Sequence, residues 1–222
     1  LADLDVLTTA RAPVLAQRPG LAAAAQAVLG LVPTPDDVVA PARLRVAVEQ
    51  SGTFLEARLA KAATSPAFSP LPDLKAAVLG LLASLPATAD RPGDPGRAWA
   101  GTGAPPPQPH LPPRAAPPAT PTLRPEAPAA EVAASLTAGA EATLARLALA
   151  QLGSLRAPDG NGAIWLVELP LRTPRGFDVL SLRIERDDRP RRADPHAEPG
   201  WSLDLAVDLD GLGPVHARVA LA

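Results

Sequence analysis

The chain has 222 residues, enough for one or two domains, and it contains no cysteine. Its 21 basic and 23 acidic residues leave a formal net charge of −2, so the sequence indicates no basic surface for nucleic acid. The lack of cysteine excludes a disulfide framework, a thiolate metal site and a cysteine nucleophile. No apolar run is long enough to predict insertion into a membrane.

Residues 1–85 are predicted to form a helical region. The stretch 21–32 is rich in strong helix formers, and the predicted helix 41–62 starts with a proline, which suits a first turn. Gly52 lies on the apolar stripe of that helix, where a glycine is usually kept for close packing and less often as a hinge. Asp73 can cap a further amphipathic helix, so the two helices are expected to form a hairpin.

Residues 86–128 differ in composition from the rest of the chain, because about a third of them are proline and few are strongly apolar. Such a segment buries too little surface to offset its chain entropy. It is therefore predicted to be a disordered linker, partly in the polyproline II conformation.

Residues 129–222 predict a C-terminal α+β domain. A helix at 131–155 is followed by strands at 163–171 and 177–187 and by a terminal hairpin at 201–222. The fold class is therefore α+β: an N-terminal helical region, a Pro-rich linker, and one helix with an antiparallel or mixed four-strand sheet.

The terminal hairpin alternates between apolar and polar residues, which is typical of a sheet with one buried face. The predicted buried face is expected to pack toward the helix at 131–155, and it consists of Trp201, Leu203, Leu205, Val207, Val219 and Leu221. The opposite face carries Asp204, Asp208 and Arg218 and is expected to lie in solvent.

The search for catalytic chemistry finds little. Asp204 and Asp208 lie four residues apart near His216 and Arg218, and a carboxylate pair beside a histidine could do acid–base work. A solvated hairpin face with a cross-strand ion pair explains the same residues more simply. His110, His196 and His216 form no pair with metal-ligand spacing. We therefore predict that the protein is not an enzyme and needs no metal or cofactor.

Four stretches resemble one subgroup of flagellar hook-length control proteins of the FliK type. "LRVAVEQSGTFLEARLA" (44–60) resembles that subgroup's "SG-x-F-x-E-x-x-L" helix, and "PDLKAAVLGLLASL" (72–85) resembles the helix that follows it. "WLVELPLRTPRGFDVLSLRIERD" (165–187) looks like the hairpin leading into the C-terminal domain. "WSLDLAVDLDGLGPVHARVAL" (201–221) is similar to the hairpin with the family core "L-x-P-x-x-L-G-x-V-x-V-x-L".

Within that core motif Leu212, Gly213 and Val215 match the family, whereas Leu209 stands where the family usually has proline. In the family, another strand and a helix follow this hairpin and cover the sheet, so the chain is expected to stop inside its C-terminal domain. That domain is expected to be marginally stable without them.

The resemblance implies a regulator that gauges hook length during its own export from the bacterial cytoplasm through the flagellar type III apparatus. Its partners would be the export gate protein and the hook and hook-cap proteins, and the C-terminal domain would switch export from hook to filament subunits. The alternatives are a non-flagellar bacterial adaptor that tethers two binding modules through the Pro-rich linker, and a helical domain with an unrelated binding sheet.

Overall fold

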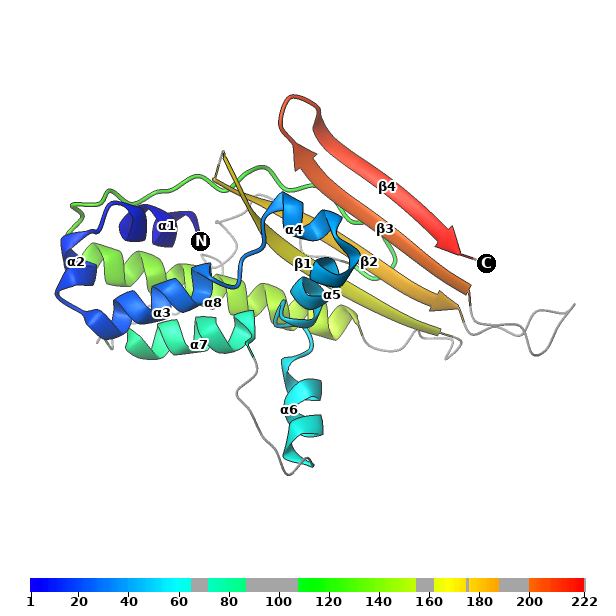
Figure 1. Ribbon diagram of the computed structural model, residues 1–222, viewed down its shortest axis with the longest axis horizontal. Helices are drawn as coiled ribbons and strands as arrows, with labels where there is room; N and C mark the ends of the chain where they lie inside the picture. Colours follow the sequence, from blue (N-terminus) through cyan, green and yellow to red (C-terminus); the bar gives the residue numbers. More distant parts are fainter. Residues whose placement is uncertain (65–71, 87–107, 155–161, 175, 188–199, 222) are drawn as a thin grey trace, which may run out of the picture.

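A computed structural model describes residues 1–64, 72–86, 108–154, 162–174, 176–187 and 200–221. The helices are α1 (Ala2–Thr9), α2 (Pro13–Ala16), α3 (Pro19–Leu29), α4 (Pro35–Val39), α5 (Pro41–Glu49), α6 (Leu55–Ala63), α7 (Leu74–Ser84) and α8 (Ala129–Gly153). The strands are β1 (Gly162–Thr173), β2 (Gly176–Asp187), β3 (Gly200–Leu209) and β4 (Gly213–Leu221). The α+β class is confirmed, and the sheet is entirely antiparallel with the order β1-β2-β3-β4 (Figure 1).

The sheet has two unlike faces, which we name after the helices that pack on them. On the α8 face, Ile164 and Leu166 of β1 pack against Ala150 of α8. On the α5 face, Val167 and Leu169 pack with side chains of α5, which lies in front of the sheet in Figure 1. Cross-strand partners share a face, so the register places every residue of β2, β3 and β4 on one face or the other.

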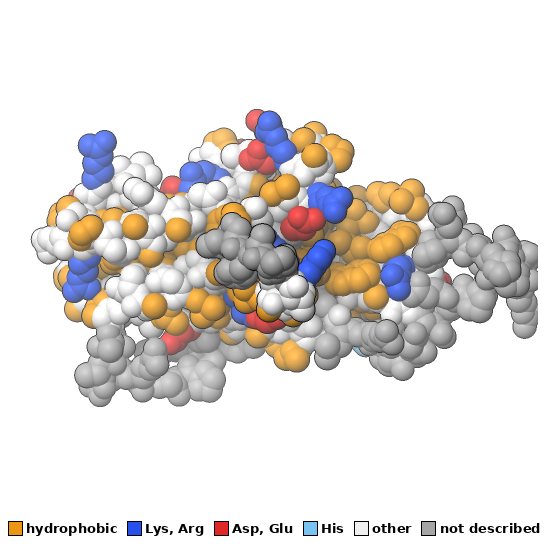
Figure 2. Space-filling view, turned by 60° about the horizontal axis from the view of Figure 1, so that its bottom comes forward, with side chains coloured by type: hydrophobic (Ala, Val, Ile, Leu, Met, Phe, Trp, Pro, Cys, Tyr) orange, Lys and Arg blue, Asp and Glu red, His pale blue; other side chains and the backbone are white. Residues whose placement is uncertain are grey.

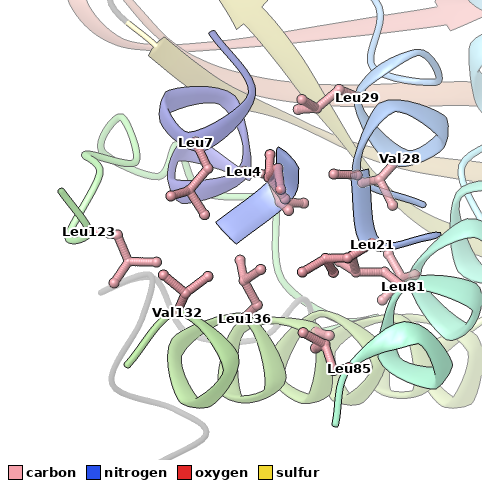
Figure 3. Close-up of a cluster of buried hydrophobic side chains, with 14 of the residues drawn as sticks. Leu4, Leu7, Leu21, Val28, Leu29, Leu81, Leu85, Leu123, Val132 and Leu136 are labelled. Atoms are coloured by element: carbon pink, nitrogen blue, oxygen red, sulfur yellow. The ribbon is translucent and has the colours of Figure 1, made fainter. Parts of the chain in front are cut away.

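The main hydrophobic core lies among the helices (Figure 3). Leu7 of α1 and Val28 of α3 have no exposed surface, and Val132 of α8 closes the core from the other side. Prolines begin α2 and α3, where a missing N–H costs no helical hydrogen bond. The core also takes in Leu81 of α7, so the N-terminal helices, α7 and α8 form one packed unit.

The structure corrects the single helix predicted over 41–62. The chain leaves the helix after α5 and turns before α6, because Gly52 has a φ of +93°. The residues on either side of this turn keep the helical spacing of apolar side chains, so the pattern alone does not show the break. The α6 helix points away from the rest of the molecule (Figure 1).

The predicted disordered linker is also corrected over residues 108–128; residues 87–107 lie outside the described part. Leu123 is a member of the main core, and Ala119 donates its N–H to the carbonyl of Phe177 in β2 at 2.8 Å. Figure 1 shows this green segment running from the sheet to the start of α8. The helical region and α8 share a core, so the expected boundary at residue 129 does not separate two packed units.

Candidate interaction surface

The hairpin between β3 and β4 carries the residues that match the family core motif. Leu209 ends β3 and pairs with Gly213, which begins β4 with a φ of +76°. Leu212 projects from the turn with 77% of its surface exposed, and Val215 is half-buried on the α5 face. A glycine suits position 213 because a side chain there would be strained.

The predicted buried face of this hairpin is the α5 face, and the structure gives its residues three different environments. Val207 is buried, and Leu203 and Leu205 are partly buried against the cluster that includes α5. In contrast, Trp201, Val219 and Leu221 are 40%, 50% and 69% exposed. The expectation that the whole face packs toward α8 is wrong, because α8 lies on the other side of the sheet.

The exposed part of the α5 face is an apolar surface with aromatic side chains. Trp165 of β1 and Trp201 of β3 stack with 6.0 Å between their ring centroids and 14° between their planes. The guanidinium of Arg186 lies 6.0 Å from the Trp201 ring centre. Figure 2 shows hydrophobic side chains gathered over the sheet on this side of the molecule. Exposed apolar surface with aromatic and arginine side chains is typical of protein-binding sites.

The α8 face of the same hairpin is solvated only in part: His216 and Arg218 are exposed, as the sequence predicts for this face, but Asp204 is not. Asp204 is only 3% exposed, and its carboxylate accepts a hydrogen bond from Arg183 at 3.3 Å. His216 and Arg218 approach the other carboxylate oxygen at 3.7 and 3.8 Å. The arrangement neutralises a buried charge on a strand.

The Ser51–Thr53 turn is the second distinctive site, and its geometry explains the glycine between two buried polar residues. A Cβ on Gly52 would lie 2.9 Å from both Cβ and N of Lys75 and 3.2 Å from a methyl of Leu147. The turn therefore brings the backbone against the start of α7 and the side of α8. Ser51 and Thr53 are buried and hydrogen-bond to each other at 3.2 Å.

A polar network connects this turn with three helices. Gln151 of α8 donates to the carbonyl of Thr53 at 3.0 Å and to the carboxylate of Glu56 in α6. The ammonium of Lys75 in α7 pairs with the same carboxylate and donates to the Gln151 side chain at 3.0 Å. The sequence pattern did not single out Gln151, because its partners lie far away in the chain.

Asp73 and Arg58 complete the junction. Asp73 caps α7 by accepting from the N–H groups of Lys75 and Ala76, as the sequence predicts, and it is only 2% exposed. Arg58 of α6 donates to its carboxylate at 3.2 Å and to the carbonyl of Glu49 at 2.9 Å. Burial raises the pKa of Asp73 above its usual range, against the opposing effects of the helix N–H groups and Arg58. Burial also acts to raise the pKa of Glu56, but the hydrogen bond from Lys75 and its other hydrogen bonds bring that pKa below its usual range.

Two further polar contacts were missed from the sequence. Arg146 of α8 donates its Nε–H to Glu168 of β1 at 2.9 Å, and both side chains are largely buried. Asp3 of α1 accepts hydrogen bonds from the N–H groups of Leu123 and Thr122. Each joins residues remote in sequence, and a charged residue in an apolar helical or strand pattern was the only available signal.

Within the described ranges, no group of three or more metal-ligating side chains comes together. His110 is exposed, and His196 lies outside these ranges. Nor does any helix of the described chain combine the length and apolarity that crossing a membrane requires.

The fold and site define an α+β protein with a partly exposed apolar sheet face and a polar junction between helices. Comparison of the chain with family models, with curated proteins and with solved structures finds no match.

Proposed function

We propose that the chain belongs to a regulator of flagellar type III export that sets hook length and switches export from hook to filament subunits. The observation that supports this best is the position of the hairpin that resembles the family core. Its apolar face is exposed at Trp201, Val219 and Leu221, where the strand and helix that follow in the family, or the partner itself, would pack. The proposed partner is the cytoplasmic part of the export gate, with hook and hook-cap proteins met during export.

The Ser51–Thr53 turn adds support from a second stretch of the resemblance. The glycine of the "SGTF" motif fits between α7 and α8, and the glutamate two residues after the phenylalanine pairs with Lys75. These residues therefore have a role in holding α6 and α7 on α8. On this proposal the junction positions the helices, and the sheet carries the contact with the gate.

The test uses a bacterium that lacks its own hook-length protein and is complemented with the complete gene. Val219→Asp places a charge on the exposed apolar face and is expected to give overlong hooks without filaments. Val39→Asp is the matched control, since Val39 of α4 is 81% exposed. It should leave hook length and filaments unchanged.

A second variant tests the spacer. Removing about ten residues between 87 and 107 shortens the reach of the fully extended, exported chain by about 31 Å and leaves the described contacts of 108–128 in place. The expected result, measured by electron microscopy of isolated hooks, is a shorter mean hook length with filaments retained. If Val219→Asp and this deletion both restore normal hooks and filaments, the hook-length proposal fails.

A further inference from the structure

Residues 108–123, here called the strap, cross the molecule as an extended segment with few anchors. Most of the strap is exposed, and only Ala116 and Leu123 are buried. It forms no helix and only a single isolated bridge with the sheet, between Ala119 and Phe177. The strap therefore rests on the domain through a small number of contacts that can be examined one by one.

The first anchors attach the strap to β2, one through an arginine on its α8 face and one through a backbone bridge at its edge. Arg183 donates its Nε–H to the carbonyl of Pro109 at 2.8 Å, and Ala119 donates its N–H to the carbonyl of Phe177 at 2.8 Å. A proline-rich chain offers many carbonyl acceptors and few N–H donors. It therefore suits a sheet surface that presents an arginine, which only donates. The same arginine also pairs with the buried Asp204, so it is held in place whether or not the strap is docked.

The last anchor is stronger and joins the strap to the helical core. Asp3 accepts from the N–H of Leu123 at 2.8 Å and from the hydroxyl of Thr122 at 2.8 Å. Ser135 of α8 donates to the same carboxylate at 3.1 Å. Leu123 is itself part of the main core. This end of the strap is therefore fixed, and the part before it is held by single hydrogen bonds.

Beneath the weakly held part lies a cavity of about 170 Å³ between α7, α8 and the sheet. Ala116 and Ala119 of the strap form part of its wall, opposite Leu74, Leu147 and Phe177. The Arg146–Glu168 pair lies at its edge. The cavity is already partly open, and moving the strap would widen its opening without separating the helices from the sheet.

We propose that the strap is a gate: residues 108–119 lift from the sheet as a unit while the remainder stays folded, and the Asp3 anchor at Thr122 and Leu123 stops the opening. Segments with few buried contacts open at lower free energy than the core. Proline-rich chain loses less conformational entropy on docking, so a few contacts suffice to close it again. This inference does not depend on the flagellar proposal.

The chain contains no cysteine, so a single introduced cysteine is the only thiol that can react. Ala116→Cys puts a thiol under the strap beside the cavity, where there is room for sulfur. Ala140→Cys places one in the helical core at 5% exposure, and Ala130→Cys places one on the exposed first turn of α8. The readout is the rate of reaction with a small thiol reagent at increasing concentrations of urea below the unfolding transition.

The thiol at 116 should react more slowly than that at 130 but at least about tenfold faster than that at 140, with little dependence on urea. Ala119→Pro, which removes the N–H donated to Phe177, should raise the rate at 116 by about three- to tenfold and leave that at 140 unchanged. Thr120→Pro is the matched control, since Thr120 is exposed and makes no hydrogen bond with the described residues.

Two results overturn the gate. One is equal rates at 116 and 140 with the same urea dependence, which means that the strap opens only on global unfolding. The other is a rate at 116 as fast as at 130, which means that the strap is not closed. Hydrogen exchange on the unaltered chain gives an independent measurement: the Ala119 amide should exchange at a lower free energy of opening than the Leu136 amide of α8.

Discussion

Replacing Gly52 by alanine tests the junction between the helices most directly. The substitution forces a side chain into a backbone with a φ of +93°, at a cost of about 1–2 kcal/mol. Its methyl group would also lie 2.9 Å from the backbone nitrogen of Lys75, in the first turn of α7, and 3.2 Å from Leu147. Overpacking of this kind costs about 1–3 kcal/mol. Together these costs predict a loss of about 2–5 kcal/mol in the free energy of unfolding.

The assay is urea unfolding followed by circular dichroism, with two other glycines as controls. Gly80 of α7 and Gly139 of α8 are exposed, and a Cβ on either would meet nothing within 4 Å. Alanine at these positions should stabilise the protein by up to about 1 kcal/mol each, because glycine is a poor helix former. The reasoning is refuted if Gly52→Ala raises the urea midpoint as the helical substitutions do.

Three other predictions follow from the buried polar groups and the sheet. Burial acts to raise the pKa of Asp3, but the hydrogen bonds from Leu123, Thr122 and Ser135 outweigh it and bring that pKa below its usual value of 3.8. The stability from Asp3 is thus present above the unfolded-state pKa and lost as pH falls through the folded-state pKa. Asp3→Asn should cost about 1–3 kcal/mol at pH 7, and the difference from wild type in urea unfolding should shrink below pH 4. Arg146→Ala should lower the free energy of unfolding by about 3–5 kcal/mol, because it leaves Glu168 buried without this partner. Replacing Arg146 and Glu168 together by leucine should lower it far less. A similar loss in the single and the double variant would contradict the ion-pair explanation. Leu205→Asp should lower the melting temperature by several degrees, because Leu205 is partly buried. Leu221→Asp, at a 69% exposed site, should change the free energy of unfolding by less than about 0.5 kcal/mol. Equal effects of the two substitutions would count against the described burial.

The strands were predictable from the sequence because alternation in one strand is a local signal. All four strands lie where the pattern predicts them, and β1 and β2 pair along their length from Thr173 and Gly176 onward. The cap at Asp73 is likewise local, since the two N–H groups that donate to its carboxylate belong to Lys75 and Ala76. The helix predicted at 131–155 is also present, and its Val132 and Leu136 are buried in the main core.

The errors arose where a remote contact decides the local structure. The helical periodicity of 41–62 continues through Gly52, and only the approach of Lys75 and Leu147 explains why the chain turns there. The composition of 108–128 predicts disorder, because it cannot reveal Arg183 donating to Pro109 from 74 residues away. Propensity and composition describe what a segment can do alone, and these segments are held by partners.

The sequence also does not show which elements cover each face of the sheet. Alternation in β3 separates Leu203 and Leu205 from Asp204 correctly, but it does not say what covers either side. The polar side carries a buried carboxylate because Arg183 neutralises Asp204 and the strap lies over that face. The apolar side is left half-covered because α4 and α5 pack over β1, at the other side of the sheet from β4. A buried ion pair needs partners fixed in place, whereas an exposed apolar face can accept a partner from outside. The face that carries Trp201 and Val219 is therefore the one on which we expect binding, and the face that carries Asp204 is the one that holds the molecule together.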